Sequence, residues 1–198
     1  MLTSQDSGLP ATTTTLALKE WGAVACALLD GRQTVLLRKG GIHEKVFRVG
    51  SDHFVLFPTV AHSHRERVRP EHRDLLGPGE DQIADGGGAF TVRCGVSLVD
   101  VVEVARPEGL TDIADLHIWT AESVRTDRLE FRPKHPLQVL VVRAFELLRP
   151  VTLERLDRYG GCKSWVELPL HWDGRSGRQV HGDGRLTGDA LRVRAAVS

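Results

Sequence analysis

The chain has 198 residues, the size of one ordinary domain. Hydrophobic residues make up 41% and charged residues 26%, which is normal for a globular protein with a sizeable core. The formal net charge is zero, so the composition excludes a global electrostatic attraction to nucleic acid or membranes. Any such preference must be local.

The basic residues are unevenly distributed. Between Arg32 and Arg73 the chain has nine Lys or Arg against four Asp or Glu, and five of its nine His. This pattern indicates a basic face that could contact phosphate, although an ordinary solvated surface gives the same pattern.

The cysteines and the N-terminal residues indicate in which cellular compartment the protein is expected. Cys26, Cys94 and Cys162 are widely spaced and form no C-x-x-C pair, so they predict neither a zinc ribbon nor a disulfide framework. The first 15 residues lack a basic region followed by an apolar run, and no apolar stretch approaches about 18 residues. We therefore expect a cytoplasmic protein with no membrane partner.

The first part of the chain predicts one helix and three strands. Residues 1–14 are polar and Thr-rich and are expected to be a disordered tail. Near-helical spacing of Leu18, Trp21 and Leu28 predicts a helix over Leu16–Leu29, the alternative being a buried strand at GAVACALL. Strands follow at 33–38, 45–49 and 53–59, where Pro58 is expected to end the third. Residues 61–76 are polar and partly helical, divided at Pro70.

The second part begins with a glycine-rich loop over 77–89. A long strand over 90–104 and a helix starting at Thr111-Asp112 come next. The segment Pro136–Leu148 predicts a strand buried on both faces except at Arg143 and Glu146. Residues 171–198 are poor in large apolar side chains and are expected to be a weakly ordered C-terminal tail.

These elements predict an α+β fold. A curved mixed or barrel-like β-sheet with a few packed helices accounts for their order better than a regular βαβ alternation. We expect a single domain over residues 15–170, with the glycine-rich loop inside it.

The most informative motif is Arg38-Lys39-Gly40-Gly41 at the end of a predicted strand. Glycines let backbone N–H groups approach an anion, and Arg and Lys supply charge and donors. The motif is neither a Walker loop nor a dinucleotide fingerprint. A plain turn that needs φ > 0 at one glycine explains the same residues.

Other chemical readings are weaker. His62 and His64, with Asp52 and His53 nearby, match no recognised metal-ligand spacing, so no metal site is predicted. Glu20, Glu44 and Lys45 match a metal-dependent nuclease only in part. Cys162 could be a nucleophile with His117, His135 or His171 as base, but no spacing selects one of them, and a buried small apolar residue is the preferred interpretation.

Six blocks in order carry a family resemblance: LKEW, GRQTVLLRKGGIHE, FVLFPTVAH, HIWT, PLQVLVVRAFEL and YGGCKSWVEL. Together they resemble the bacterial family called domain of unknown function 1802, over roughly residues 16–170. The chain departs from that pattern at Ser63, where a Gln is expected after His62.

The resemblance implies a functional region but no reaction and no cofactor. The residues it groups are Arg38, Lys39, Gly40, Gly41, Glu44, Pro58, Thr59 and His62. The layout also resembles RNA-binding barrels of the PUA and ASCH type, in which a Gly-Lys-x-x-Glu-like segment lines a cleft.

Three functions are therefore expected, in order. The first is a nucleic-acid- or nucleotide-phosphate-binding domain in which Arg38 and Lys39 contact phosphate, the Gly40-Gly41 backbone closes on it, and Thr59 also binds the ligand. Glu44 and His62 would orient the ligand or transfer protons. The second is a metal-dependent phosphodiester- or nucleotide-processing enzyme using the same Glu44 and His62. The third is a structural or regulatory interaction protein.

Overall fold

The computed structural model describes residues 13–40, 46–60 and 64–198. Its centre is a seven-stranded mixed sheet in the order β2-β5-β4-β3-β1-β6, with β7 paired to β5. β1 and β3 are parallel, whereas the other pairs are antiparallel. The strands are β1 (Thr15–Trp21), β2 (Val35–Lys39), β3 (His53–Thr59), β4 (Ala89–Glu103), β5 (Leu137–Glu154), β6 (Trp165–Leu168) and β7 (Arg178–Gln179).

Four short helices and one longer helix pack with this sheet in the described chain. They are α1 (Gly22–Leu29), α2 (His64–Arg67), α3 (Leu76–Glu80), α4 (Ala121–Val124) and α5 (Asp183–Val197), with 3-10 turns η1 (Pro70–Leu75), η2 (Asp85–Gly87), η3 (Pro107–Leu116) and η5 (Asp157–Tyr159) and a π-helical segment η4 (Arg125–Glu130). The predicted α+β class with a mixed sheet is confirmed. No helix in the described ranges is long and apolar enough to cross a membrane.

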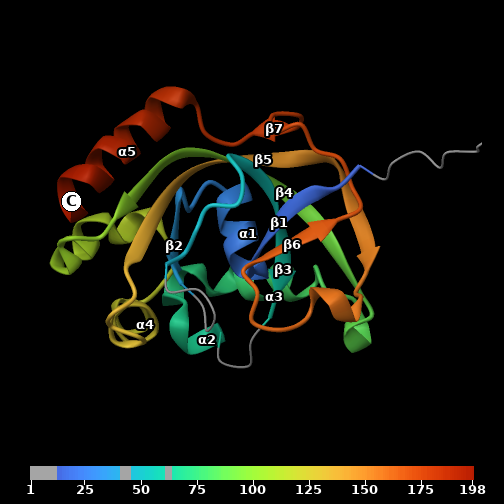
Figure 1. The fold of residues 1–198 in the computed structure, drawn as a ribbon, viewed down its shortest axis with the longest axis horizontal. Coiled ribbons are helices and arrows are strands. Elements are labelled where there is room, and N and C mark those ends of the chain that lie inside the picture. Colours follow the sequence, from blue (N-terminus) through green and yellow to red (C-terminus); the bar gives the residue numbers. More distant parts are fainter. Residues whose placement is uncertain (1–12, 41–45, 61–63) are drawn as a thin grey trace, which may run out of the picture.

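The sheet is strongly curved. β4 and β5 run as long strands that bend around α1, near the middle of the molecule (Figure 1). Register shifts at Val92/Cys94 and Leu98/Asp100 mark bulges in this pair, and bulges increase local bending and twist. As a result the side chain of Arg38 in β2 reaches the backbone of β1, although β5, β4 and β3 separate the two strands in the sheet.

Both faces of the sheet are buried. Successive residues of β1 show this directly, because Leu18 belongs to the core around α1 whereas Ala17 belongs to an aromatic cluster on the opposite face. That second cluster includes Phe57, Phe90 and Tyr159. Consecutive side chains of β1 therefore lie in different environments, on opposite faces of the sheet.

The predicted helix over Leu16–Leu29 is wrong in its first part. Residues 15–21 form β1, and only Gly22–Leu29 is helical, so GAVACALL is α1 and not a strand. α1 is buried nearly all round, which explains its uniformly small and apolar sequence. It packs so closely on α3 that a Cβ on Gly22 would lie 2.1 Å from the Gly79 carbonyl oxygen.

Other boundaries also differ from the prediction. Residues 46–49, part of the expected strand over 45–49, form no strand, and residue 45 lies outside the described ranges. The bounds of β3 match the predicted strand over 53–59, so the strand continues one residue past Pro58. Pro58 is tolerated because β4 does not pair with β3 at this position in the described chain. The expected loop over 77–89 contains the end of α3 and η2. In place of one helix from Thr111, the chain forms η3 and then α4, which Thr120 caps by accepting from the Ser123 N–H.

The C-terminal segment was expected to be weakly ordered, and this is corrected by the structure. Residues 183–197 form α5, which buries Leu186 and contributes Val193, Ala196 and Val197 to the main core. The helix sits close to η3, where a Cβ on Gly109 would lie 1.9 Å from the Ala196 carbonyl oxygen. Buried Asp189 accepts from the Thr34 hydroxyl at 2.9 Å and anchors the helix.

Candidate functional site

The ends of β1, β2 and β3 meet at one place. Because β1 and β3 are parallel, Trp21 lies opposite Thr59 and both carboxyl ends reach the same edge. The Thr59 hydroxyl donates to the Glu20 carbonyl oxygen at 3.1 Å. Arg38, near the end of β2, donates to the Lys19 carbonyl oxygen at 3.3 Å. We call the group Glu20, Arg38, Lys39, Thr59 and Arg128 the Glu20 cluster.

A buried ion pair lies at the centre of the Glu20 cluster. Arg38 Nη1 is 3.0 Å from Glu20 Oε2, and the two side chains are only 14% and 5% exposed. The other carboxylate oxygen accepts from the Trp21 N–H at 2.9 Å. The Arg38 guanidinium also lies 5.1 Å from the centre of the Phe47 ring. Its Nε is buried and has no hydrogen-bond partner among the described residues.

Lys39 is held by the π-helical segment η4. Its Nζ donates to the carbonyl oxygens of Arg128 at 2.6 Å and Leu129 at 3.4 Å. Burial, together with the nearby Arg128 guanidinium, lowers the pKa of Lys39. Both cations expected to contact phosphate are thus already in contact with groups of the protein itself.

Arg128 adds a third cation. Burial lowers the pKa of its guanidinium, and so does the charge of Arg38, while Glu20 acts in the opposite direction. Its Nε is also buried without a hydrogen-bond partner in the described part of the chain. The cluster therefore places Arg38 and Arg128 close to the Glu20 carboxylate and Lys39 beside Arg128, and two guanidinium N–H groups lack an acceptor in the described chain.

Two tryptophans lie beside the Glu20 cluster. The rings of Trp21 and Trp119 are 4.8 Å apart in an edge-to-face arrangement. Arg67 lies 5.8 Å from the Trp21 ring centre, and Arg128 lies 5.9 Å from that of Trp119. Arg67 also pairs with Asp127 at 3.3 Å. Cationic and aromatic side chains therefore lie next to one another on this side of the Glu20 cluster.

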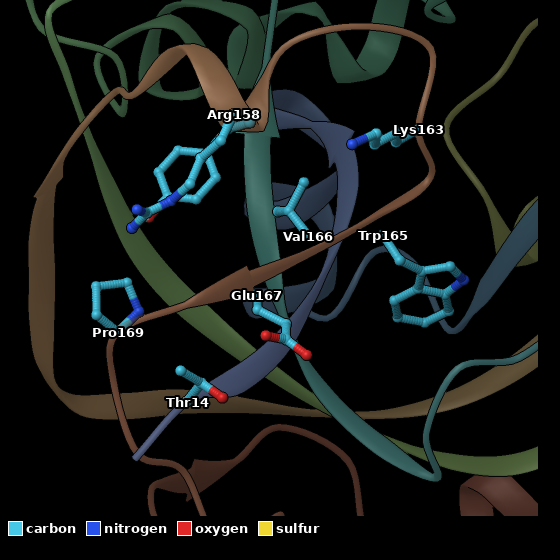
Figure 2. A pocket seen from close by; sticks show the side chains of 8 residues that line it. Thr14, Arg158, Lys163, Trp165, Val166, Glu167 and Pro169 are labelled. Atoms are coloured by element: carbon cyan, nitrogen blue, oxygen red, sulfur yellow. The ribbon is translucent and has the colours of Figure 1, made fainter. Parts of the chain in front are cut away.

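A second cationic region, which we call the Arg158 pocket, lies on β6 and the loop before it (Figure 2). It is an open cavity of about 580 Å³ lined by Thr14, Arg158, Tyr159, Lys163, Trp165, Val166, Glu167 and Pro169. Among the described residues, no ion pair involves Arg155, Arg158, Lys163 or the adjacent Lys19. The cations of this region are therefore not neutralised by contact with a carboxylate.

Lys19 shows the crowding of like charges. Burial lowers its pKa, and the nearby Arg155 and Lys163 lower it further. Its Nζ donates to the carbonyl oxygens of Gly160 at 3.3 Å and Gly161 at 3.0 Å. Lys19 and Glu20 are neighbours in β1 and point to opposite faces, so one strand contributes to both cationic regions.

An aromatic pair connects the two regions. The Phe47 ring under Arg38 stacks on Trp165, with ring centres 5.8 Å apart, and Trp165 lines the Arg158 pocket. The Trp165 indole N–H donates to the Arg48 carbonyl oxygen at 3.0 Å. The partly exposed Trp165 therefore offers an aromatic surface next to unpaired cations.

A family model described as a domain of unknown function (DUF1802) matches residues 17–190. The chain belongs to this family. The matched range confirms the resemblance found in the six sequence blocks, and it continues past residue 170 into α5. No curated protein matches the sequence.

Two solved structures align with this DUF1802 domain. The crystal structure of ASCH from Zymomonas mobilis has 13% sequence identity and a TM-score of 0.44, covering 92% of this chain and 95% of that chain. A mutant ASCH protein from the same organism has 13% identity and a TM-score of 0.40, covering 69% and 72%. ASCH barrels were among the expected architectures, but scores of this size carry no argument about function.

The structure brings part of the predicted site together. Arg38, Lys39 and Thr59 share the Glu20 cluster, and Gly40 is buried directly after β2. Gly41, Glu44 and His62 lie outside the described residues. Cys162, interpreted from the sequence as a buried residue, is exposed. Within the described ranges no three His, Cys, Asp or Glu side chains come together as metal ligands.

The sequence interpretation missed Arg128, Arg158 and Lys163 of the DUF1802 domain, and it considered Glu20 only as part of an incomplete nuclease pattern. Glu20 gave a signal, because it and Lys19 are the two charged residues in the run LALKEWGAV, but its partner could not be identified from spacing. Arg128 gave none, since it lies in a stretch with alternating charges. Arg158 and Lys163 lie on either side of the Gly-Gly-Cys segment 160–162 and follow no recognised motif spacing, so no sequence pattern indicated them.

Proposed function

We propose that this DUF1802 domain binds single-stranded nucleic acid, with phosphate groups at the Glu20 cluster and at the Arg158 pocket. The observation that carries the proposal is the pair of buried guanidinium Nε–H groups of Arg38 and Arg128, which have no acceptor in the described chain. A buried donor without a partner is unfavourable by about 1–3 kcal/mol, and a phosphate oxygen would satisfy it.

Charge supports an anionic ligand. The Glu20 cluster contains three cations, Arg38, Lys39 and Arg128, and one carboxylate, Glu20, so its local charge is positive despite a net charge of zero for the whole chain. The Arg158 pocket adds unpaired cations and the aromatic surface of Trp165. Sites for single-stranded nucleic acid typically combine cations along the path of the phosphate backbone with aromatic side chains on which bases stack.

A substitution that keeps the positive charge tests whether binding needs the guanidinium group of Arg38 and not only its charge. Arg38→Lys keeps a cation for Glu20 but removes the Nε–H and the forked geometry. Fluorescence anisotropy measures the affinity for a short single-stranded RNA and for a DNA of the same sequence. We expect Arg38→Lys to bind them about tenfold more weakly than the unmodified protein, which corresponds to about 1.4 kcal/mol.

The matched control is Arg149→Lys, at an exposed position of β5. It should bind like the unmodified protein, and thermal melting should show that both variants are folded. Binding that is absent at low salt, or that is unchanged in Arg38→Lys, would refute the proposed site and leave an interaction protein as the better interpretation.

A second candidate function is metal-dependent processing of a phosphodiester or nucleotide by Glu44 and His62. The observation in its favour is that these residues follow Gly40 and Val60, which are the described residues after β2 and β3 at the Glu20 cluster. Its test is turnover of RNA, DNA and nucleotides with a panel of divalent metals. Activity that Glu44→Gln and His62→Gln both abolish would support an enzyme, and an inert protein would exclude it.

A further inference from the structure

A separate cavity lies between η3, α4 and η4, beside the helix labelled α4 in Figure 1. We call it the His117 pocket. Its volume is about 390 Å³, within the usual range of roughly 300–1,000 Å³ for small-molecule sites. Its apolar walls include Leu110, Ala114, Trp119, Val124 and Leu129.

His117 provides a polar group at this pocket. The side chain is 1% exposed, and its Nδ1 accepts from the Trp119 backbone N–H at 3.2 Å. The proton of the neutral imidazole is therefore on Nε2. That Nε2 has no hydrogen-bond partner among the described residues. Burial, with the nearby Arg69, lowers the pKa of His117 to about 4, so the ring is a neutral donor at physiological pH.

Arg69 provides the charge. It also lines the His117 pocket, and its guanidinium donates to the His117 carbonyl oxygen. Its Nε is buried and makes no hydrogen bond in the described chain, and the nearest carboxylate to this Nε is that of the exposed Glu71, in a long ion pair of 3.5 Å. A ligand carboxylate would therefore replace Glu71 at this nitrogen. The two other charged lining residues are less available, because Arg125 pairs with Glu122 at 2.6 Å and Glu108 is exposed.

We propose that the His117 pocket binds a small, mainly apolar carboxylic acid, whose carboxylate accepts from His117 Nε2–H and Arg69 Nε–H. The apolar walls would take the hydrocarbon part of the ligand. A carboxylate fits better than a neutral carbonyl because one of the two donors is cationic, and hydrogen bonds between charged groups are the stronger ones.

The test compares three molecules of similar shape on the full-length protein: naphthalene-1-acetate, naphthalene-1-acetamide and 1-ethylnaphthalene. Calorimetry gives the affinities, and NMR of the His117 ring reports binding at this pocket. We expect the acetate to bind about tenfold more tightly than the amide, and the ethyl compound to bind most weakly.

Arg69→Gln should reduce the preference for acetate over amide to nearly nothing, whereas Arg149→Gln, the matched loss of one exposed cation, should keep it. Arg38→Lys should also keep it, which separates this site from nucleic-acid binding. The proposal is overturned if the acetate shows no saturable shift of the His117 ring up to its solubility limit, or if acid and amide bind equally well to the unmodified protein. Because these last comparisons use the unmodified protein, they do not depend on a variant folding.

Discussion

The Glu20 cluster and the Arg158 pocket both concentrate positive charge, but they hold it differently. In the Glu20 cluster, Arg38 and Lys39 are partly buried and contact a carboxylate and backbone carbonyls. In the Arg158 pocket, the cations are exposed and no described carboxylate pairs with them. The first arrangement gives a fixed geometry because burial and packing restrict the side chains. In the Arg158 pocket the charged side chains are exposed, so dissolved salt screens their charge and packing restricts their motion less.

This difference predicts opposite responses to substitution. Changes in the Glu20 cluster should act first on stability, since they leave a buried charge without a partner. Changes in the Arg158 pocket should act on ligand binding alone, since exposed cations contribute little to folding.

The largest effect is expected for Glu20→Ala. It removes the partner of Arg38, and breaking a buried ion pair typically lowers the free energy of unfolding by about 3–5 kcal/mol. Urea denaturation followed by circular dichroism measures this change. The matched substitution Glu167→Ala, at an exposed carboxylate of the Arg158 pocket, should change stability by no more than about 0.5 kcal/mol. Similar losses for both variants would contradict the distinction between the two regions.

A second prediction concerns salt. Each phosphate contact in a single strand contributes about 0.7 to the slope of log affinity against log salt. The double substitution Arg158→Gln/Lys163→Gln should therefore lower the magnitude of that slope by about 1.4, with stability unchanged. Anisotropy titrations at several salt concentrations provide the measurement, and Arg149→Gln is the control. An unaltered slope would mean that the Arg158 pocket does not contact the strand.

The smallest expected effect is a shift in one pKa. Arg155 is the charge that most lowers the pKa of Lys19, after burial itself. Arg155→Gln should therefore raise the pKa of Lys19 toward its ordinary value, as NMR of the lysine side chain can follow. Stability should not change measurably, because Arg155 is exposed. A pKa of Lys19 that stays the same or falls would show that the cations of this pocket do not act on one another.

Much of the sheet could be predicted from the sequence. The run HFVLFPT predicts the bounds of β3, and the β-branched stretches of β4 and β5 identify the two longest strands, although β5 continues to Glu154. The first strand could not be recognised, because TLALKEW pairs in parallel with β3, and such a partner is distant in the sequence. α5 did carry a signal, since Leu186, Val193 and Val197 follow helical spacing, but many polar residues around them concealed it.

The sequence by itself determined the α+β class, the family, and the position of a basic segment that ends in Arg38 and Lys39. Only the tertiary structure decided what surrounds those cations. Glu20 is 18 residues from Arg38, and Arg128 is 89 residues from Lys39. They meet because the curved sheet brings β2 back to β1 and because η4 packs at the end of β2. Local patterns indicate which residues are charged, but the pairing of buried charges depends on long-range packing.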